Sequence, residues 1–273
     1  MNLAKIITGA AVAALVAISG SAIAADGKTE AVTPAKGSPL SELFSGYKYA
    51  KPGTQATQDD DFANPGMAWN DIGAEQWNKV DGKAGKACAT CHKDASVSMK
   101  GVGARYPVYF PAMKKVMNVE DRVNNCRTKY MKADKWKYDS GKMLGTVIYV
   151  KQQSLGMKIN VKTDGAAKAA YEAGKKFYYE RRGQLDMSCA HCHENYYGKK
   201  IRMNTLSQGQ INGFPVYRLK WQKPGSAHRR FKGCNKQVRA APFKSGSKEY
   251  LNLELYLAAR GNGLTVETPA VRN

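Results

Sequence analysis

The chain has 273 residues, with 43 lysines and arginines, 22 aspartates and glutamates, and a formal net charge of +21. That length accommodates one large domain or two domains of common size. The positive excess favours a small anionic substrate or an acidic protein partner, and part of it is ordinary solvated surface. A basic composition is also compatible with binding nucleic acid. The export signal predicted at the N-terminus argues against that partner.

The first 24 residues have the pattern of a cleavable secretory signal peptide. They contain Lys5, an apolar run, and then Ala22-Ile23-Ala24, a small-x-small cleavage site. The run is short for a retained membrane anchor, and no later segment is long and uncharged enough to cross a bilayer. We therefore expect an exported, periplasmic protein with no membrane span in its mature chain and no nucleic acid as partner.

Residues 25–65 are polar and show little periodicity. They are expected to form an extended N-terminal arm that wraps the body, with one short helix near "SPLSELFSGY". Two segments that resemble each other follow, residues 66–164 and 165–273, with "NVKTDGAAK" as the linker between them. This internal similarity is the strongest organisational signal in the chain.

The two segments share a series of features in the same order. Each has a helix-like stretch with aromatics, a C-x-x-C-H motif, an "FP" dipeptide, an arginine four residues before a lone cysteine, and an apolar helical pattern after a serine N-cap. The matched positions are Cys88–His92 and Cys189–His193, Phe110-Pro111 and Phe214-Pro215, Arg122 and Arg230, Cys126 and Cys234, and Ser140 and Ser247.

C-x-x-C-H is the attachment motif of c-type haem. Its cysteines form thioethers with the haem vinyl groups, and the adjacent histidine then binds the iron. One such motif could belong to a zinc or redox site, but two in an exported chain predict two covalently bound haem c groups. The predicted attachment residues are Cys88, Cys91, Cys189 and Cys192, and the predicted proximal ligands are His92 and His193.

The predicted fold is therefore mostly α. It consists of two tandem class I cytochrome c-like lobes related by duplication, preceded by the extended arm. The first lobe, residues 66–164, carries haem 1, and the second, residues 165–273, carries haem 2 and the active site.

Cys126 and Cys234 remain after haem attachment. They lie 34 and 41 residues after the haem histidines, where a small cytochrome c places its distal iron ligand. The methionines have no such matched positions, so His92 with Cys126 and His193 with Cys234 are the predicted ligand pairs, with potentials below those of His/Met sites. Two alternatives stay open: a Cys126–Cys234 disulfide, and His228 as ligand of the second iron.

The sequence around Cys234 is more basic than that around Cys126. Five cations lie near Cys234, namely Arg229, Arg230, Lys232, Lys236 and Arg239, whereas Cys126 also has Glu120 and Asp121 nearby. Nearby cations lower a thiol pKa, and guanidinium groups bind oxyanions. The second lobe is thus the better active-site candidate, although a solvated face or a docking patch for an acidic redox partner would show the same charges.

Several longer stretches resemble the SoxA family, the larger subunits of the SoxAX cytochromes of sulfur-oxidising bacteria, in their dihaem form. The most specific stretches are "DDDFANPGMAW" (59–69), "GFPVYRL" (213–219), "RRFKGCN" (229–235) and "LELYLAARGNGLTVETPAVR" (253–272), together with both haem motifs. The resemblance covers essentially the whole mature chain.

This resemblance implies an L-cysteine S-thiosulfotransferase that joins thiosulfate oxidatively to a cysteine of the SoxYZ carrier. Its implied partners are a SoxX-type monohaem cytochrome c subunit and a soluble cytochrome c that accepts two electrons. It further implies that Cys234 is the catalytic, persulfide-forming ligand of haem 2, that Arg230 binds substrate, and that Cys126 is the distal ligand of haem 1. The competing function is a dihaem electron carrier without chemistry of its own.

Overall fold

The structure is a computed structural model that describes residues 28–273, so the predicted signal peptide lies outside the described residues. Helices dominate, as predicted, and the strands are short. The principal helices are α1 (Pro52–Asp59), α2 (Met67–Asn78), α3 (Cys88–His92), α4 (Ala95–Ser98), α5 (Val102–Arg105), α6 (Val119–Cys126), α7 (Gly141–Gln152), α8 (Lys168–Tyr179), α9 (Ala227–Gln237) and α10 (Lys248–Arg260). Within residues 28–273, no helix has the length and apolar character needed to span a membrane.

The strands form three small sheets. They are β1 (Val108–Phe110), β2 (Lys115–Met117), β3 (Lys200–Ile201), β4 (Asn204–Thr205), β5 (Val216–Arg218), β6 (Lys223–Gly225) and β7 (Ala270–Arg272). β1–β2 and β3–β4 are antiparallel hairpins, and the third sheet has the order β6-β5-β7, with β7 parallel to β5. Single helical turns lie between these elements, namely η1 (Gly46–Tyr49), η2 (Pro111–Met113), η3 (Arg127–Met131), η4 (Gly165–Ala167), η5 (His191–Asn195) and η6 (Leu219–Trp221).

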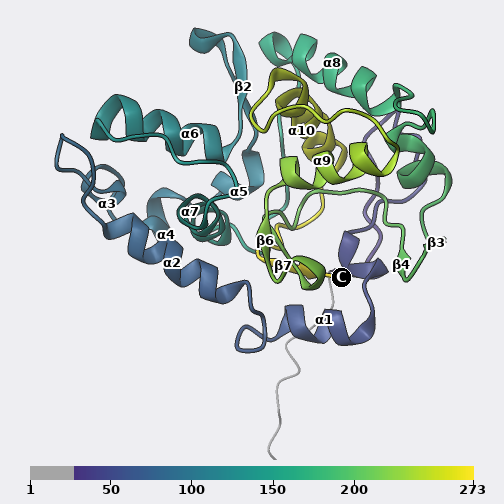
Figure 1. The fold of residues 1–273 in the computed structure, drawn as a ribbon, viewed down its shortest axis with the longest axis horizontal. Coiled ribbons are helices and arrows are strands. Elements are labelled where there is room, and N and C mark those ends of the chain that lie inside the picture. Colours follow the sequence, from purple (N-terminus) through teal and green to yellow (C-terminus); the bar gives the residue numbers. More distant parts are fainter. Residues whose placement is uncertain (1–27) are drawn as a thin grey trace, which may run out of the picture.

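The elements occur in the same order in the first half (residues 66–164) and the second half (residues 165–273). In each half a helix leads to the C-x-x-C-H turn, and a hairpin, a cysteine-bearing helix and a long apolar helix follow. The matching elements are α2 and α8, α3 and η5, β1–β2 and β5–β6, α6 and α9, and α7 and α10. In Figure 1 the helices α2, α3, α6 and α7 lie on the left, and α8, α9 and α10 lie at the upper right. The β3–β4 hairpin is an addition in the second half.

The first and last helices of each half cross at a glycine. A Cβ on Gly73 of α2 would lie 2.2 Å from the carbonyl oxygen of Gly145 in α7. A Cβ on Gly174 of α8 would lie 2.0 Å from the carbonyl oxygen of Asn252 in α10. Only glycine lets the two backbones approach so closely, so these residues set the crossing in both halves.

The apolar helices α7 and α10 form the core of each half. Both begin where the serine N-caps were predicted, with Ser140 accepting a hydrogen bond from Met143 N and Ser247 from Tyr250 N. In α7, Met143, Leu144 and Ile148 are fully buried, and in α10 every residue from position 250 to 260 is buried. The helical periodicity seen in the sequence is therefore confirmed, and each such buried large side chain stabilises the fold by roughly 1.5–3 kcal/mol.

The hairpins correct the pairing of the "FP" dipeptides. Phe110 is the third residue of β1 and pairs with Lys115, while Arg218 is the third residue of β5 and pairs with Lys223. The residue that corresponds to Phe110 is therefore Arg218. Phe214-Pro215 precedes its strand as Tyr106-Pro107 precedes β1, so matching it to Phe110-Pro111 was wrong. The match based on the sequence failed because a dipeptide does not show which positions of two strands correspond. The pairing of each strand with its neighbour does show this.

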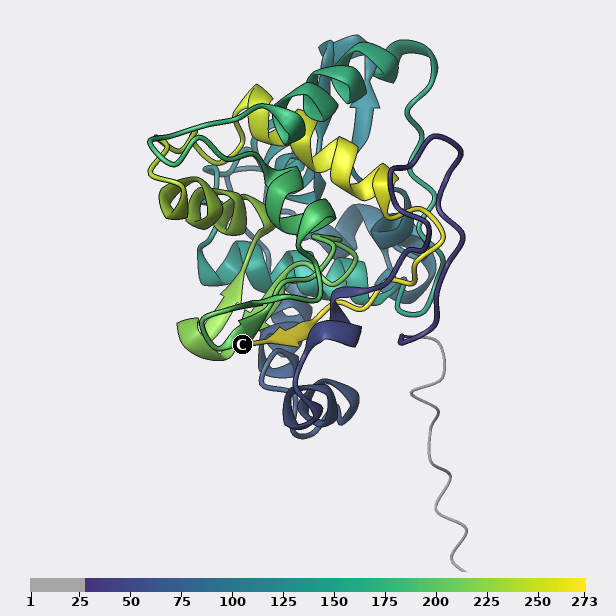
Figure 2. The same cartoon turned by 90° about the vertical axis from the view of Figure 1, so that its right-hand side faces the viewer.

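The N-terminal arm runs along the second half and ends beside the C-terminal strand (Figure 2). No helix begins within the predicted "SPLSELFSGY" stretch except the short turn η1, Gly46–Tyr49, because this part of the arm bonds to its surroundings. Phe44 N donates to Gln208 Oε1 at 2.8 Å, and Gln208 Nε2 donates to the carbonyl of Glu42 at 2.9 Å.

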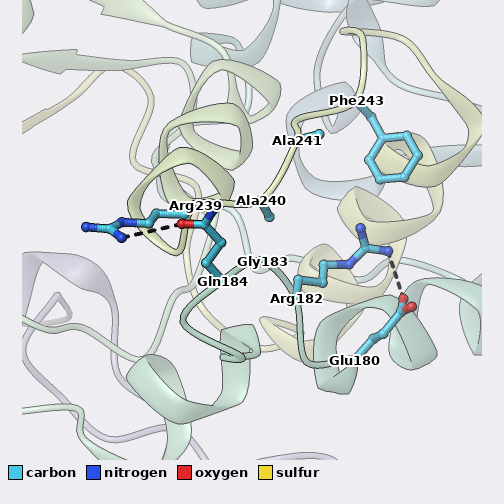
Figure 3. A pocket seen from close by; sticks show the side chains of 8 residues that line it. All are labelled: Glu180, Arg182, Gly183, Gln184, Arg239, Ala240, Ala241 and Phe243. Carbon is cyan, nitrogen blue, oxygen red and sulfur yellow. Dashed lines mark hydrogen bonds and ion pairs between the residues drawn. The ribbon is translucent and has the colours of Figure 1, made fainter.

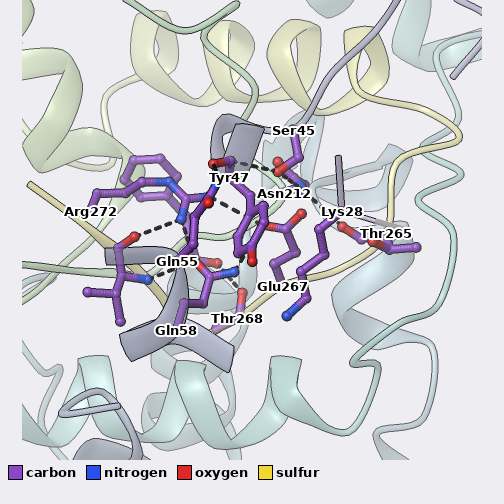
Figure 4. A network of polar contacts seen from close by, with 12 residues as sticks. Lys28, Ser45, Tyr47, Gln55, Gln58, Asn212, Thr265, Glu267, Thr268 and Arg272 are labelled. Atoms are coloured by element: carbon purple, nitrogen blue, oxygen red, sulfur yellow. Dashed lines mark hydrogen bonds and ion pairs between the residues drawn. The ribbon is translucent and has the colours of Figure 1, made fainter. Parts of the chain in front are cut away.

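A polar network ties the arm to the C-terminal segment (Figure 4). Arg272 Nη1 donates to Gln58 Oε1, and Arg272 Nη2 lies 3.2 Å from Glu267 Oε2. Thr54 Oγ1 donates to Asn273 Oδ1 at 2.7 Å. Buried polar groups are costly unless they are paired, so these bonds hold the arm and the C-terminal segment in one arrangement.

A second buried network joins the two halves where α6 and α9 begin. His228 of α9 is fully buried, and its Nε2 lies 2.9 Å from Glu254 Oε2 of α10. Asn118, the N-cap of α6, donates to the same carboxylate at 2.8 Å. Burial and the neighbouring Glu254 raise the pKa of Glu120, which is also buried, to about 7. The helices that carry the two lone cysteines thus start from one shared polar cluster.

Gly73→Ala and Gly174→Ala are expected to destabilise the protein by roughly 1–3 kcal/mol, because each added methyl overlaps a carbonyl oxygen of the crossing helix. Gly53→Ala is the matched control, since Gly53 lies in α1 with nothing within 4 Å of its added Cβ. Urea unfolding followed by circular dichroism measures the difference. Equal stability of the three variants would contradict the crossing argument.

The free energy of unfolding should depend on pH through Glu120. The folded chain keeps the Glu120 proton to about pH 7, whereas a free glutamate loses it near 4.5. The contribution of this group to stability therefore falls as pH rises from about 4.5 to about 7. Glu120→Gln removes this titrating group. From about pH 4.5 to about pH 7, the free energy of unfolding of the variant should therefore rise relative to that of the parent, by at most on the order of 3 kcal/mol.

The matched control for this titration is Glu172→Gln, at an exposed position of α8. Urea unfolding of both variants and the parent at several pH values separates the two sites. A pH profile of Glu120→Gln that runs parallel to the parent's would show that Glu120 does not retain its proton.

Candidate functional site

Cys234 lies in a cluster with the second C-x-x-C-H motif. It is on α9, which begins at Ser226, whose Oγ accepts a hydrogen bond from Arg229 N at 3.1 Å. Cys234 lies close enough to His193, Cys189 and Cys192 for these groups to influence one another's ionisation. The structure therefore brings together the attachment cysteines, the proximal histidine and the lone cysteine predicted for haem 2.

The Cys234 thiol ionises more readily than an ordinary thiol. Burial raises its pKa, but positive charge outweighs this effect. The charge of Arg230, a hydrogen bond with His193 and the charge of Arg218 together lower the pKa to about 7. By contrast, burial and the nearby Cys234 raise the pKa of Cys189 to about 12.

Arg218 belongs to this cluster and was not predicted from the sequence. It lies at the end of β5, 16 residues before Cys234, outside the basic stretch that drew attention. Its guanidinium carbon lies 4.8 Å from the centre of the Trp221 ring, and that of Arg229 lies 4.3 Å from the same ring. No signal along the sequence singles it out, because its correspondence with Phe110 appears only in the strand register of the two hairpins.

The second half fits a c-type haem. Nδ1 of His193 lies 2.7 Å from the carbonyl oxygen of Ser207, so an Nδ1–H donates to it and Nε2 is left for a metal. Gly209, with φ of 77°, lies against the same ring, and a Cβ there would be 2.8 Å from His193 Cγ. The surroundings thus hold the ring in one orientation, as a proximal ligand requires. Cys189 and Cys192 would form the thioethers, and His193 and Cys234 would bind the iron.

The first half gathers the corresponding residues. Cys88, Cys91 and Cys126 interact electrostatically, and the His92 ring lies 5.8 Å from that of Trp77. Burial raises the pKa of Cys126, and the charge of Arg122 offsets this only in part. These residues also fit a haem c, with Cys88 and Cys91 as thioethers and His92 and Cys126 toward the iron. The Cys126 thiol, however, does not share the acidity of Cys234.

The disulfide alternative is wrong for this structure. All six cysteines fall within residues 28–273, and none is in a disulfide. Cys126 neighbours Cys88 and Cys91, whereas Cys234 neighbours Cys189 and Cys192. The two lone cysteines therefore belong to separate clusters.

His228 is also excluded as the second iron ligand. Its Nδ1 accepts a hydrogen bond from Gly246 N at 2.9 Å, and its Nε2 faces Glu254. The ring stacks on Tyr138, with centres 5.2 Å apart and planes 12° from parallel. Both nitrogens are therefore engaged in the polar cluster between the halves.

A surface cavity lies beside the second cluster (Figure 3). It has a volume of about 600 Å³, and its lining includes Arg182, Gln184, Arg239 and Phe243. The Arg182 guanidinium lies over the Phe177 ring at 4.0 Å. Its positive charge offsets part of the rise in the pKa of Cys189. Arg239, one of the five cations near Cys234 in sequence, also lines this cavity and donates to Gln184 Oε1 at 3.4 Å.

Comparison with known proteins finds SoxA proteins similar to this chain over most of its length. Residues 72–159 match the family model for the cytochrome c domain of SoxA and TsdA. The "L-cysteine S-thiosulfotransferase subunit SoxA" of Rhodovulum sulfidophilum is 43% identical over 98% of this chain and 100% of its own length. The protein of the same name from Pseudaminobacter salicylatoxidans is 45% identical over 89% of this chain and 85% of its own.

A solved structure agrees with these relatives. The crystal structure of SoxXA from P. pantotrophus matches with a TM-score of 0.83 and 45% sequence identity, covering 86% of this chain and 89% of that one. The similarity therefore extends over both halves, and not only over the matched cytochrome c domain. On the strength of its sequence, its fold and its paired cysteine clusters, the chain belongs to the SoxA family.

Proposed function

We propose that this chain is the catalytic subunit of a periplasmic L-cysteine S-thiosulfotransferase, which conjugates thiosulfate oxidatively to a cysteine of a SoxYZ-type carrier. The observation that carries this proposal is the contrast between the two lone cysteines. Arg230, Arg218 and His193 lower the pKa of Cys234 to about 7, whereas the pKa of Cys126 is raised. Thiolate is the nucleophilic form of sulfur, so Cys234 is the reactive one.

The reaction needs one new sulfur–sulfur bond and the loss of two electrons. Arg230 holds the oxyanion end of thiosulfate, and the sulfane sulfur bonds to the Cys234 thiolate with release of two electrons. The carrier thiolate then attacks that sulfane sulfur and displaces Cys234 as thiolate, as in thiol–disulfide exchange. The carrier thiol loses one proton overall, and its cysteine ends linked to the sulfane sulfur of thiosulfate.

The proposed cofactors are two haem c groups, one in each of two tandem class I cytochrome c-like lobes. Two C-x-x-C-H turns and two matched sets of elements support both the haem count and an origin by duplication. Bound haem supplies one-electron acceptance and passes the electrons to a soluble cytochrome c. Cys88, Cys91 and His92 would hold the first haem and Cys189, Cys192 and His193 the second.

The proposed partner is a SoxX-type monohaem cytochrome c, since the similar crystal structure is of a SoxXA complex. The carrier and the electron acceptor follow from the activity named for the relatives. Export to the periplasm is supported by the leader-like sequence of residues 1–24. The mature domains would be residues 25–65 as arm, 66–164 as first lobe and 165–273 as second lobe.

The mass of the protein isolated from its native compartment tests the cofactor assignment. We expect two covalent haems per chain, with one attached to each C-x-x-C-H peptide after proteolysis. We also expect a reducible addition of sulfur or thiosulfate on the Cys234 peptide and none on the Cys126 peptide. One haem, or an addition on Cys126 instead, would contradict the assignment of the two halves.

Replacement of Cys234 tests the catalytic assignment. Cys234→Met keeps a possible iron ligand but removes the nucleophile, so carrier-dependent thiosulfate oxidation with the partner subunit present should fall at least roughly a hundredfold. Cys126→Met is the matched control at the repeated position and should keep activity within about tenfold of the parent. Cytochrome c reduction and the mass of the carrier peptide are measured together.

The same pair of variants separates the two candidate functions. Full activity in Cys234→Met would support a dihaem electron carrier and overturn the transferase assignment. Equal losses in both variants would instead mean that electron transfer through both haems, and not sulfur chemistry at Cys234, limits turnover.

A further inference from the structure

The same hairpin position holds different residues in the two halves. In the first half it is Phe110, and the Arg122 guanidinium carbon lies 4.9 Å from the centre of its ring. In the second half it is Arg218, beside Arg230, the counterpart of Arg122. The first half shows that this hairpin forms with an aromatic residue at the position, so the scaffold itself does not require an arginine there.

Arg218 is held in place on two sides. Its Nε donates to the carbonyl oxygen of Asn273 at 2.7 Å, and its guanidinium faces the Trp221 ring, which Arg229 also approaches. A guanidinium has five N–H donors, so its two terminal nitrogens are left to bind a further group. An arginine oriented in this way loses little conformational entropy when it binds an anion.

In the part of the chain that the structure describes, acidic side chains do not balance the positive charge around Cys234. Within residues 28–273, none of Arg218, Arg229 and Arg230 forms an ion pair with an aspartate or glutamate. The guanidinium groups of Arg218 and Arg229 both approach the Trp221 ring, so two like charges lie close together and disfavour each other. A bound dianion would relieve this repulsion. In the first half, the counterpart of Arg229 is Asp121, which pairs with Lys115 at 2.9 Å.

We propose that Arg218 is a second substrate-binding residue, which holds the sulfonate end of thiosulfate together with Arg230. The sulfonate has three oxygens, and one guanidinium can bind two of them in a bidentate fashion. A second guanidinium binds the third oxygen and balances the second charge. With the sulfonate fixed between the two arginines, the sulfane sulfur is directed to Cys234. This assignment rests on the proposed function.

The test replaces Arg218 with phenylalanine, the residue that the first half uses at this position. Arg218→Lys is the second variant, because it keeps the charge and loses the planar donor geometry. Lys220→Ala is the matched control, because Lys220 is an exposed cation of the neighbouring turn η6. Each variant is prepared as the haem-loaded complex with the partner subunit.

Arg218→Phe should raise the KM for thiosulfate roughly ten- to a hundredfold, the effect of losing hydrogen bonds to a charged group. Its kcat should fall by less than KM rises, because Cys234 is kept while the loss of the Arg218 charge raises the pKa of its thiol. Arg218→Lys should recover part of the loss, and Lys220→Ala should change KM less than about twofold. Calorimetric titration with thiosulfate should show the same order of affinities.

A structural role for Arg218, through Asn273 alone, predicts a lower urea midpoint for both Arg218 variants with unchanged KM and unchanged thiosulfate affinity. That result would overturn the inference while leaving the transferase intact. An equal rise in KM for Lys220→Ala and Arg218→Phe would also overturn it, since it would show only long-range steering by charge. Failure of the proposed function is recognised separately, by full activity of Cys234→Met.

Discussion

The relative placement of the two halves depends on the buried polar cluster where α6 and α9 begin. Ionisable groups removed from water are tolerated only when they are paired, and breaking a buried pair costs roughly 3–5 kcal/mol. His228, Glu254 and Asn118 pair across the interface, and burial beside them raises the pKa of Glu120. Because both cysteine-bearing helices start here, the same cluster orients Cys126 toward one haem motif and Cys234 toward the other. It also removes His228 from competition for iron.

The two halves share a scaffold and differ in electrostatics. Each has a glycine crossing, a C-x-x-C-H turn, a hairpin and a helix that ends near a cysteine. In the first half Arg122 lies against the Phe110 ring, Asp121 pairs with Lys115, and burial raises the pKa of Cys126. In the second half the charges of Arg230 and Arg218 act on Cys234 and lower its pKa. The two halves thus share one scaffold, and a few different side chains make the Cys234 thiol more acidic than the Cys126 thiol.

The arm and the C-terminal segment connect to this site through one residue. Asn273 accepts from Thr54 of the arm through its side chain and from Arg218 through its main-chain carbonyl. Arg272, next to it, bonds to Gln58 of α1. A contact between residues more than 200 positions apart, Thr54 and Asn273, therefore supports the guanidinium whose charge lowers the pKa of Cys234. The hydrogen bonds of the arm therefore order the C-terminal residues Arg272 and Asn273, and Asn273 in turn binds Arg218.

The sequence by itself determined the local features of this protein. Helical periodicity, the serine caps and the two C-x-x-C-H motifs depend on residues within one or two turns, and the structure confirms the helices at Ser140 and Ser247. Matched cysteines also sufficed to single out Cys126 and Cys234. Only the tertiary structure decided the role of His228, the register that matches Arg218 with Phe110, and the excess of charge at Cys234. These depend on strand pairing and on contacts between distant segments, and spacing along the chain does not encode which distant groups will meet.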